Sequence, residues 1–337
     1  MRRAPWLRLL TAILGVAVLA GVAAALLPND PYQRYATLDH TIQNRVRWIY
    51  ERVHFDPTPV DIAVIGPSRS GAGISSPRLE ADLAAAGHAW HTVNFSLPEN
   101  GRDLNWVILN ELLTTKHPRL IVVGVLEKPS RYGHPAYKYV APAVAVADPA
   151  YVGNLNWLAN LIYLPYRQAR LALARLMPAA FDLPARFDPA HYAGSNDETT
   201  TTFIAGDGTR VERDVSPGAA ALAAGKVRYE RGVRPPKLGR RLADVEFGDE
   251  RTYLRRMAAV ARAHGVRVAF LFLPYYIGPT ELQERALYAT IGPVFDAAFV
   301  RTHAEWYSDV AHLNHAGAVV VTDWLAPQLV PLMEAPR

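Results

Sequence analysis

Short apolar segments alternate with amphipathic ones near both ends of the chain, and this rhythm restricts the fold more than any other feature. Four apolar segments have the length of strands and are bounded by turn residues: Asp61–Gly66, Trp90–Phe95, Leu120–Leu126 and Val266–Leu273. Helical spacing predicts a helix of about ten residues ending near Gly87 and further helices over Asp103–Thr115, Asp249–His264, Glu281–Thr290 and His315–Leu329, with a weaker strand near Phe299. Strands that alternate with helices pair in parallel, so the sequence predicts an α/β fold with a doubly wound sheet.

The alternation of strand and helix patterns is lost between residues 128 and 248. This stretch holds an amphipathic helix over Asn154–Leu176, which we expect to be broken at Pro165, and a turn-rich run through Gly206–Gly208. We expect one large insertion into a single sheet domain, after its third strand, and not an independent domain. The aromatic residues of the helix are expected to cover the core of the insertion, while a membrane, a partner or the substrate are the alternatives. These aromatic residues are Trp157, Tyr163 and Tyr166.

The N-terminus carries a long apolar run. Leu9–Leu27 has nineteen residues without a charged side chain, and three arginines lie within the first eight residues. A helix of this length nearly spans a bilayer core of about 30 Å, and basic residues before it favour a cytoplasmic N-terminus. We therefore expect an uncleaved transmembrane anchor over residues 1–30, with the rest of the chain outside the cytoplasm. A signal peptide cleaved near residues 23–25 is the alternative.

The segment after the anchor has apolar residues at helical spacing from Pro31 to Phe55. This spacing predicts one amphipathic helix. We assign residues 31–58 to a juxtamembrane helix that lifts a catalytic domain, residues 59–332, from the membrane. A helix of the domain core is the alternative.

The composition excludes several kinds of site. The chain has no cysteine, so disulfides, thiolate metal sites and cysteine nucleophiles are excluded. The formal charge is +5, but the basic residues are spread along the chain without a block interleaved with aromatics. Nucleic acid binding therefore has no support beyond the net charge.

A turn rich in glycine and serine, Gly66–Gly73, directly follows the first predicted strand. A nucleophilic serine needs an exposed hydroxyl on a sharp strand-to-helix turn, where a helix N-terminus supplies partial positive charge to an oxyanion. Ser68 lies where such a turn begins, and Ser70 is the competitor. A plain turn is an alternative, but a dinucleotide-binding turn is not, because no third glycine follows at the required spacing.

A second motif, Tyr307–Gly317, precedes the last predicted helix and contains Asp309 and His312. This spacing lets the carboxylate accept a hydrogen bond from one ring nitrogen and leaves the other nitrogen as a general base. The alternatives are a helix cap at Asp309 and a surface or metal-binding role for His312 and His315.

A serine after the first strand together with Asp-x-x-His before the last helix resembles the SGNH (GDSL-like) hydrolase and acyltransferase superfamily. The resemblance covers about residues 61–126 and 249–329. It implies a flavodoxin-like three-layer sandwich in which Ser68 is the nucleophile, His312 the base and Asp309 the group that orients the base. Gly-Pro-Ser-Arg at the first motif and Asp-x-x-His-Leu-Asn-x-x-Gly at the second are similar to motifs of bacterial membrane-tethered members. Those members are linked to O-acylation of cell-surface polymers, often beside a membrane-bound O-acyltransferase.

The chain departs from the family pattern at the groups that stabilise the oxyanion. Pro67 stands where the family has aspartate, Ser96 where it has glycine, and Leu126 where it has an asparagine donor. One donor is therefore missing or comes from elsewhere, and the loss of a donor typically costs about 10²–10³ in rate. The candidate oxyanion or substrate groups are Ser96 through its backbone N–H, Asn94, Asn100 and Arg69.

Glu127 follows Leu126 and has an ordinary structural interpretation. We expect it to pair with Lys128 or Arg131.

The resemblance implies a serine acyltransferase that moves an acetyl or similar group onto a hydroxyl of an envelope or secreted polysaccharide. Its expected place is the bacterial cytoplasmic membrane, with a single span and the catalytic domain on the periplasmic side. A membrane-bound O-acyltransferase is the expected partner, and no cofactor or metal is expected. A tethered carbohydrate esterase and a catalytically inactive, glycan-binding scaffold are the alternatives.

Overall fold

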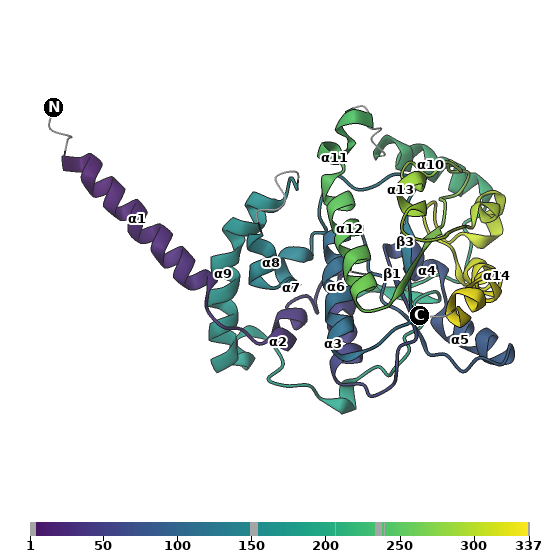
Figure 1. The fold of residues 1–337 in the computed structure, drawn as a ribbon, viewed down its shortest axis with the longest axis horizontal. Coiled ribbons are helices and arrows are strands. Elements are labelled where there is room, and N and C mark those ends of the chain that lie inside the picture. The colour runs from purple at the N-terminus through teal and green to yellow at the C-terminus, as the bar shows by residue number, and fades with distance from the viewer. Residues whose placement is uncertain (1–4, 149–153, 206, 233–237, 239, 336–337) are drawn as a thin grey trace.

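The computed structural model describes residues 5–148, 154–205, 207–232, 238 and 240–335. Its centre is a five-stranded sheet in which every neighbouring pair of strands is parallel, with the order β2-β1-β3-β6-β7 (Figure 1). The strands are β1 (Ile62–Ile65), β2 (Thr92–Asn94), β3 (Leu120–Val125), β6 (Arg267–Phe272) and β7 (Val294–Asp296). Counted along the chain, this order is the one that flavodoxin-like doubly wound sheets have.

Side chains of the central strands alternate between two hydrophobic clusters, one on each face of the sheet. In β1, Ile62 and Val64 enter one cluster while Ala63 and Ile65 enter the other, and β3 and β6 alternate in the same way. Because successive side chains of a strand point to opposite faces, a strand buried on both faces reads as a continuous apolar run. This explains why these strands could be located in the sequence as continuous apolar runs.

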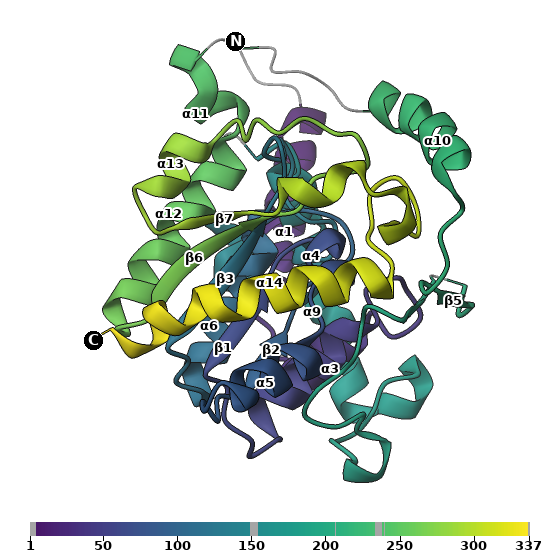
Figure 2. The same cartoon turned by 90° about the vertical axis from the view of Figure 1, so that its right-hand side faces the viewer.

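Helices cover both faces of the sheet and make three layers (Figures 1 and 2). One layer consists of α3 (Arg45–His54), α6 (Arg102–Thr115) and α12 (Gly248–Ala263), and the other of α4 (Ser68–Gly73), α5 (Ser76–Ala85) and α14 (His315–Glu334). The predicted α/β class and the parallel sheet are confirmed, and the layers are compatible with the predicted sandwich.

Two predicted elements near the sheet are wrong. The segment predicted as one helix from Pro31 to Phe55 forms two helices, α2 (Pro31–Ala36) and α3, separated by turns. Val46, Ile49 and Val53 of α3 are buried in the core of the domain, so α3 belongs to a layer of the fold. The strand expected near Phe299 is a 3₁₀ helix, Ala298–Thr302, and the last strand lies just before it.

Among its described residues, the stretch from 128 to 248 adds no strand to the central sheet. Its regular elements are α7 (Tyr137–Val140), α8 (Ala143–Ala147), α9 (Trp157–Leu176), a hairpin of β4 (Thr202–Ile204) and β5 (Arg210–Glu212), α10 (Ala219–Gly232) and α11 (Ala243–Glu246). The helix expected to break at Pro165 is continuous through it, and the hairpin was not predicted. Gly206, in the predicted turn, lies outside the described residues. Figure 2 shows α10 and β5 along one edge of the domain, and Figure 1 shows α7 to α9 on the side of α1 (Pro5–Ala25).

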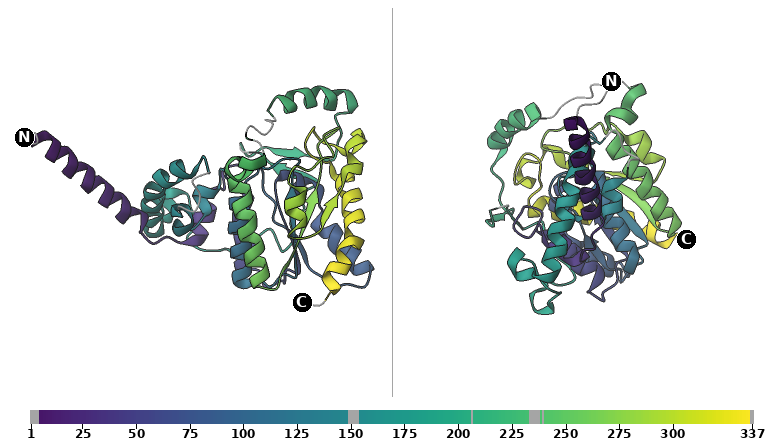
Figure 3. Two further views of the ribbon diagram at one scale, coloured as in Figure 1. Left: turned by 45° about the horizontal axis from the view of Figure 1, so that its top comes forward. Right: turned by 90° about the vertical axis from the view of Figure 1, so that its left-hand side faces the viewer.

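The N-terminal helix α1 extends away from the domain and touches it only near its end (Figure 3). Its leucines are exposed, with Leu19 at 71%. By length and composition, the one described helix that could cross a membrane is α14, and 44% of its apolar window is buried in the fold. The described apolar part of α1, Leu9–Ala25, is shorter than this length criterion. A membrane span at the N-terminus is therefore not supported by that criterion and stays a prediction.

Candidate active site

The loops that follow the strands at their carboxyl ends meet at one edge of the sheet, which is where open α/β sheets bind ligands. β1 ends at Ile65, and α4 begins only three residues later, at Ser68. Pro67 at this turn is extended (φ −76°, ψ 178°), so the chain turns sharply before entering the helix. Ser68 is consequently the first residue of α4 and is half-buried at the sheet edge.

Ser68, His312 and Asp309 form one hydrogen-bonded chain. The Oγ of Ser68 lies 2.8 Å from Nε2 of His312. Nδ1 of His312 lies 2.8 and 2.9 Å from the two carboxylate oxygens of Asp309. Because an ionised carboxylate only accepts hydrogen bonds, Nδ1 carries the ring proton and Nε2 is free to accept the hydroxyl proton of Ser68. The structure thus brings together all three residues predicted as catalytic.

The environment of Asp309 keeps its carboxylate ionised. Burial alone would raise its pKa, but hydrogen bonds from the His312 ring and from the backbone of Ala311 and His312 lower the pKa to about 2. The side chain is nevertheless 56% exposed, against 22% for His312. The carboxylate therefore stays charged at every pH at which the protein would work, while remaining in contact with solvent.

Ser70, the competing nucleophile, is a packing residue. It is 2% exposed, and its hydroxyl fills the space between the ends of β1 and β3. A Cβ placed on Gly124 would lie 1.8 Å from Oγ of Ser70, and one on Gly66 would lie 2.7 Å from it. The glycines therefore permit a close approach of α4 to the sheet, and Ser70 has no access to a substrate.

Asn94 and Ser96, two of the predicted oxyanion groups, hold the turn after β1 in place. The Asn94 amide donates to the carbonyls of Ser70 and Ile74, both at 2.9 Å, and its oxygen accepts from the N–H of Ser96 at 3.0 Å. The N–H expected to face an oxyanion is thus already engaged.

Arg69, another predicted oxyanion group, is buried in an ion pair with Glu127. Its guanidinium donates to Glu127 at 2.6 and 3.3 Å, to the carbonyl of Leu273 at 3.2 Å and to the hydroxyl of Tyr229 at 2.5 Å. The structural interpretation of Glu127 is confirmed, but this partner was not predicted, and Arg131 pairs with Glu246. The pair connects the nucleophile turn after β1 to the loop that follows the neighbouring strand β3.

Asn100 is the remaining candidate donor among the side chains. It is half-buried on the loop between β2 and α6, and no hydrogen bond of its amide is found within the described part of the chain. The first turn of α4 offers backbone donors as well. The amides of Ser70 and Gly71 bond to the carbonyl of Pro67, whereas those of Ser68 and Arg69 have no such backbone partner among the described residues.

The stretch between β3 and α12 also reaches the site. Thr199 donates to the carbonyl of Gly71 in α4 at 2.6 Å, and the hydroxyl of Thr200 lies 2.8 Å from Nδ1 of His315. Arg213, just after β5, is linked to the same histidine through its carbonyl, which accepts the N–H of His315 at 3.2 Å. Sequence reasoning missed these contacts because no periodic pattern in the stretch points to the sheet.

The described residues offer no set of side chains for the metal-binding role considered for His312 and His315. Within the described ranges, no group of three or more histidine or carboxylate side chains is arranged to hold an ion. His315, the second histidine of the motif, is paired with Thr200 instead.

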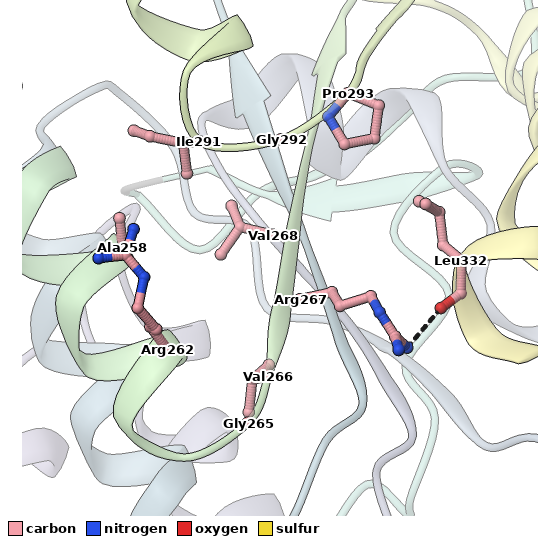
Figure 4. A pocket seen from close by; sticks show the side chains of 10 residues that line it. All are labelled: Ala258, Arg262, Gly265, Val266, Arg267, Val268, Ile291, Gly292, Pro293 and Leu332. Carbon is pink, nitrogen blue, oxygen red and sulfur yellow. Dashed lines mark hydrogen bonds between the residues drawn. The ribbon is translucent and has the colours of Figure 1, made fainter. Parts of the chain in front are cut away.

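A surface hollow of about 340 Å³ lies at the opposite end of the sheet, where β6 begins (Figure 4). It is lined by Gly265, Val268 and Leu332, among others. Arg267 in its wall donates to the carbonyl of Leu332 at 2.6 Å, which ties β6 to the end of α14. The hollow thus lies where the helix layers pack against the sheet, at the end of the sheet opposite to Ser68.

Comparison with models of known protein families gives no match, and comparison with curated proteins gives no significant match. The function proposed below therefore rests on the residues and their geometry.

Proposed function

We propose that this chain is a serine-dependent acyltransferase that moves an acetyl or similar acyl group onto a hydroxyl of an envelope or secreted polysaccharide. The observation that carries the proposal is the 2.8 Å contact between Oγ of Ser68 and Nε2 of His312, with Nδ1 held by Asp309. An activated nucleophile is recognised by this arrangement of a hydroxyl, a base and a group that orients the base.

In the proposed reaction, Nε2 of His312 takes the hydroxyl proton as Oγ of Ser68 attacks the carbonyl carbon of the acyl donor. The donor alcohol leaves with that proton, and the acyl group stays on Ser68. An acceptor hydroxyl then gives its proton to Nε2 and attacks the acyl-serine, which restores the Ser68 hydroxyl. Throughout, the ionised carboxylate of Asp309 accepts a hydrogen bond from Nδ1–H and stabilises the imidazolium that forms in each half-reaction.

Three features support an SGNH-type fold with a large insertion at about residues 128–248. The strand order is flavodoxin-like, Ser68 follows the first strand of the sheet, and Asp309 and His312 precede the last helix. The exposed leucines of α1 support an anchor in a bacterial cytoplasmic membrane, with the domain on the periplasmic side. An anchored enzyme would stay close to an acyl donor supplied by a membrane-bound O-acyltransferase partner, which raises its effective concentration.

Covalent labelling by a fluorophosphonate tests the nucleophile. We expect the wild-type chain to be labelled, Ser68→Ala to be unlabelled and His312→Ala to be labelled much more slowly. Ser216→Ala, which removes an exposed serine hydroxyl, is the matched control and should label like wild type. Absence of labelling in the wild type would favour the inactive scaffold.

The acceptor distinguishes transfer from hydrolysis. Incubation with p-nitrophenyl acetate and a polysaccharide should increase the mass of the polysaccharide by one acetyl group per modified hydroxyl. Release of acetate at the same rate with and without polysaccharide would identify an esterase instead.

A further inference from the structure

Arg213 is held beside the loop that carries His312. It follows the short strand β5, and its N–H donates to the carbonyl of Thr201 at 2.7 Å. Its carbonyl accepts the N–H of His315 at 3.2 Å, three residues after the proposed base. These backbone bonds fix the position of Arg213 relative to the start of α14.

The side chain of Arg213 is buried, and no carboxylate among the described residues lies within ion-pair distance of its guanidinium. The residue is 7% exposed, and its guanidinium carbon lies 4.3 Å from the centroid of the Phe203 ring. Nε is buried and has no hydrogen-bond partner, and Arg213 forms no ion pair with any residue that the structure describes. A guanidinium stays charged and carries five donors, and a buried charge is costly unless it is paired.

The charge of Arg213 acts at the proposed catalytic groups. Burial lowers the pKa of Arg213, and the negative charge of Asp309 raises it again. The two groups nevertheless form no ion pair in the described structure, where Asp309 pairs with His312. The Phe203 ring below the guanidinium makes a cation–π contact, which offsets part of the cost of burying the charge.

We propose that Arg213 binds an anionic group, a carboxylate or a phosphate, on the acyl acceptor of Ser68. This inference rests on the proposed acyltransferase function and narrows its substrate to acidic glycans. A planar guanidinium matches both anions because it can donate two parallel hydrogen bonds to either. With the anion in place, the buried charge is neutralised and the acceptor is oriented beside the His312 base.

Acceptor competition in the full chain tests this inference. Glucose, glucuronate and glucose 6-phosphate are each offered with p-nitrophenyl acetate, and acetylated sugar is measured by mass spectrometry. We expect one or both anionic sugars to be acetylated about tenfold faster than glucose at low concentration, the effect of about one charge-assisted hydrogen bond. A preference for glucuronate identifies a carboxylate ligand, and a preference for glucose 6-phosphate identifies a phosphate.

Substitutions of two arginines test whether Arg213 causes the preference for anionic sugars. Arg213→Gln should lose the preference for the anionic sugar, and Arg213→Lys should keep part of it. Arg210→Gln changes an exposed arginine of the same hairpin and should behave like wild type.

Two results would overturn the inference: equal rates with charged and neutral sugars in the wild type, or an unchanged preference in folded Arg213→Gln. The wild-type comparison needs no variant to fold. Failure of the proposed function is recognised separately, because the wild type would then either not react with the fluorophosphonate or release acetate at the same rate with and without an acceptor.

Discussion

Replacing Glu127 by alanine tests whether the ion pair beneath the nucleophile turn holds that turn in place. The side chains of Arg69 and Glu127 are only 4% and 8% exposed. In Glu127→Ala, Arg69 keeps its bonds to the carbonyl of Leu273 and to the Tyr229 hydroxyl but loses both carboxylate contacts. The variant therefore leaves a buried positive charge without its counter-ion.

The expected loss of stability is large for a single substitution. Removing one partner of a buried ion pair costs about 3–5 kcal/mol, because the remaining charge stays desolvated. Glu127→Gln retains one oxygen that can accept from Arg69, so we expect a smaller loss of about 1–3 kcal/mol. Since Arg69 directly follows Ser68, both variants should also slow fluorophosphonate labelling, with alanine slower than glutamine.

Urea unfolding of the full chain in detergent, followed by circular dichroism, measures these losses. Asp323→Ala is the control, since it breaks the pair with Arg78 at the surface, where the side chains are 47% and 43% exposed. Exposed pairs contribute about 0–1 kcal/mol. The reasoning is refuted if Glu127→Ala unfolds within about 1 kcal/mol of this control.

Three further substitutions give separate expectations. Gly124→Ala places a Cβ 1.8 Å from Oγ of Ser70, so we expect a destabilisation of about 1–3 kcal/mol in thermal unfolding and slower labelling of Ser68. Unchanged stability and labelling would contradict the close packing of Ser70 against Gly124. Asp309→Asn should lower kcat for p-nitrophenyl acetate about 10²- to 10⁴-fold with little change in KM, because an uncharged amide that can also donate neither fixes the proton on Nδ1 nor stabilises the imidazolium. A fall below threefold would remove Asp309 from the proposed triad. Burial raises the pKa of Asp103 to about 7, so the folded state holds this proton more tightly than the unfolded chain, and the group's contribution to stability is lost as pH rises from about 4 to about 7. Urea unfolding across this range should show a flatter pH dependence for Asp103→Asn, and an unchanged slope would argue against the raised pKa.

The sheet and the triad were accessible from sequence because both depend on short-range patterns. The central strands are buried on both faces, so they read as apolar runs whatever packs on them. Ser68 follows the first of these runs directly, and Asp309 lies three residues before His312, so each half of the triad is local in sequence. Parallel strands then bring the two halves to one edge of the sheet.

The features that were missed depend on contacts between distant segments. Glu127 was assigned a neighbour in sequence as its partner, but it pairs with Arg69, 58 residues away. Arg213 lies in a stretch without helical or strand periodicity, and its proximity to His315 follows from how that stretch wraps the domain. The turns between α2 and α3 interrupt a regular apolar spacing without glycine or proline, so spacing alone gave one helix.

The junction between α1 and α9 fixes how the N-terminal helix is attached to the domain. Gly21 of α1 lies against Pro165 of α9, and the amide of Gln168 donates to the carbonyl of Leu27 at 2.9 Å just after α1 ends. Asn29 donates to the same glutamine at 3.2 Å. With α1 in a bilayer, as proposed, these contacts would hold the domain, and with it Ser68, at one distance from the lipid surface. A polymer acceptor of the proposed reaction would then have to pass Ser68 at that distance to be modified along its length.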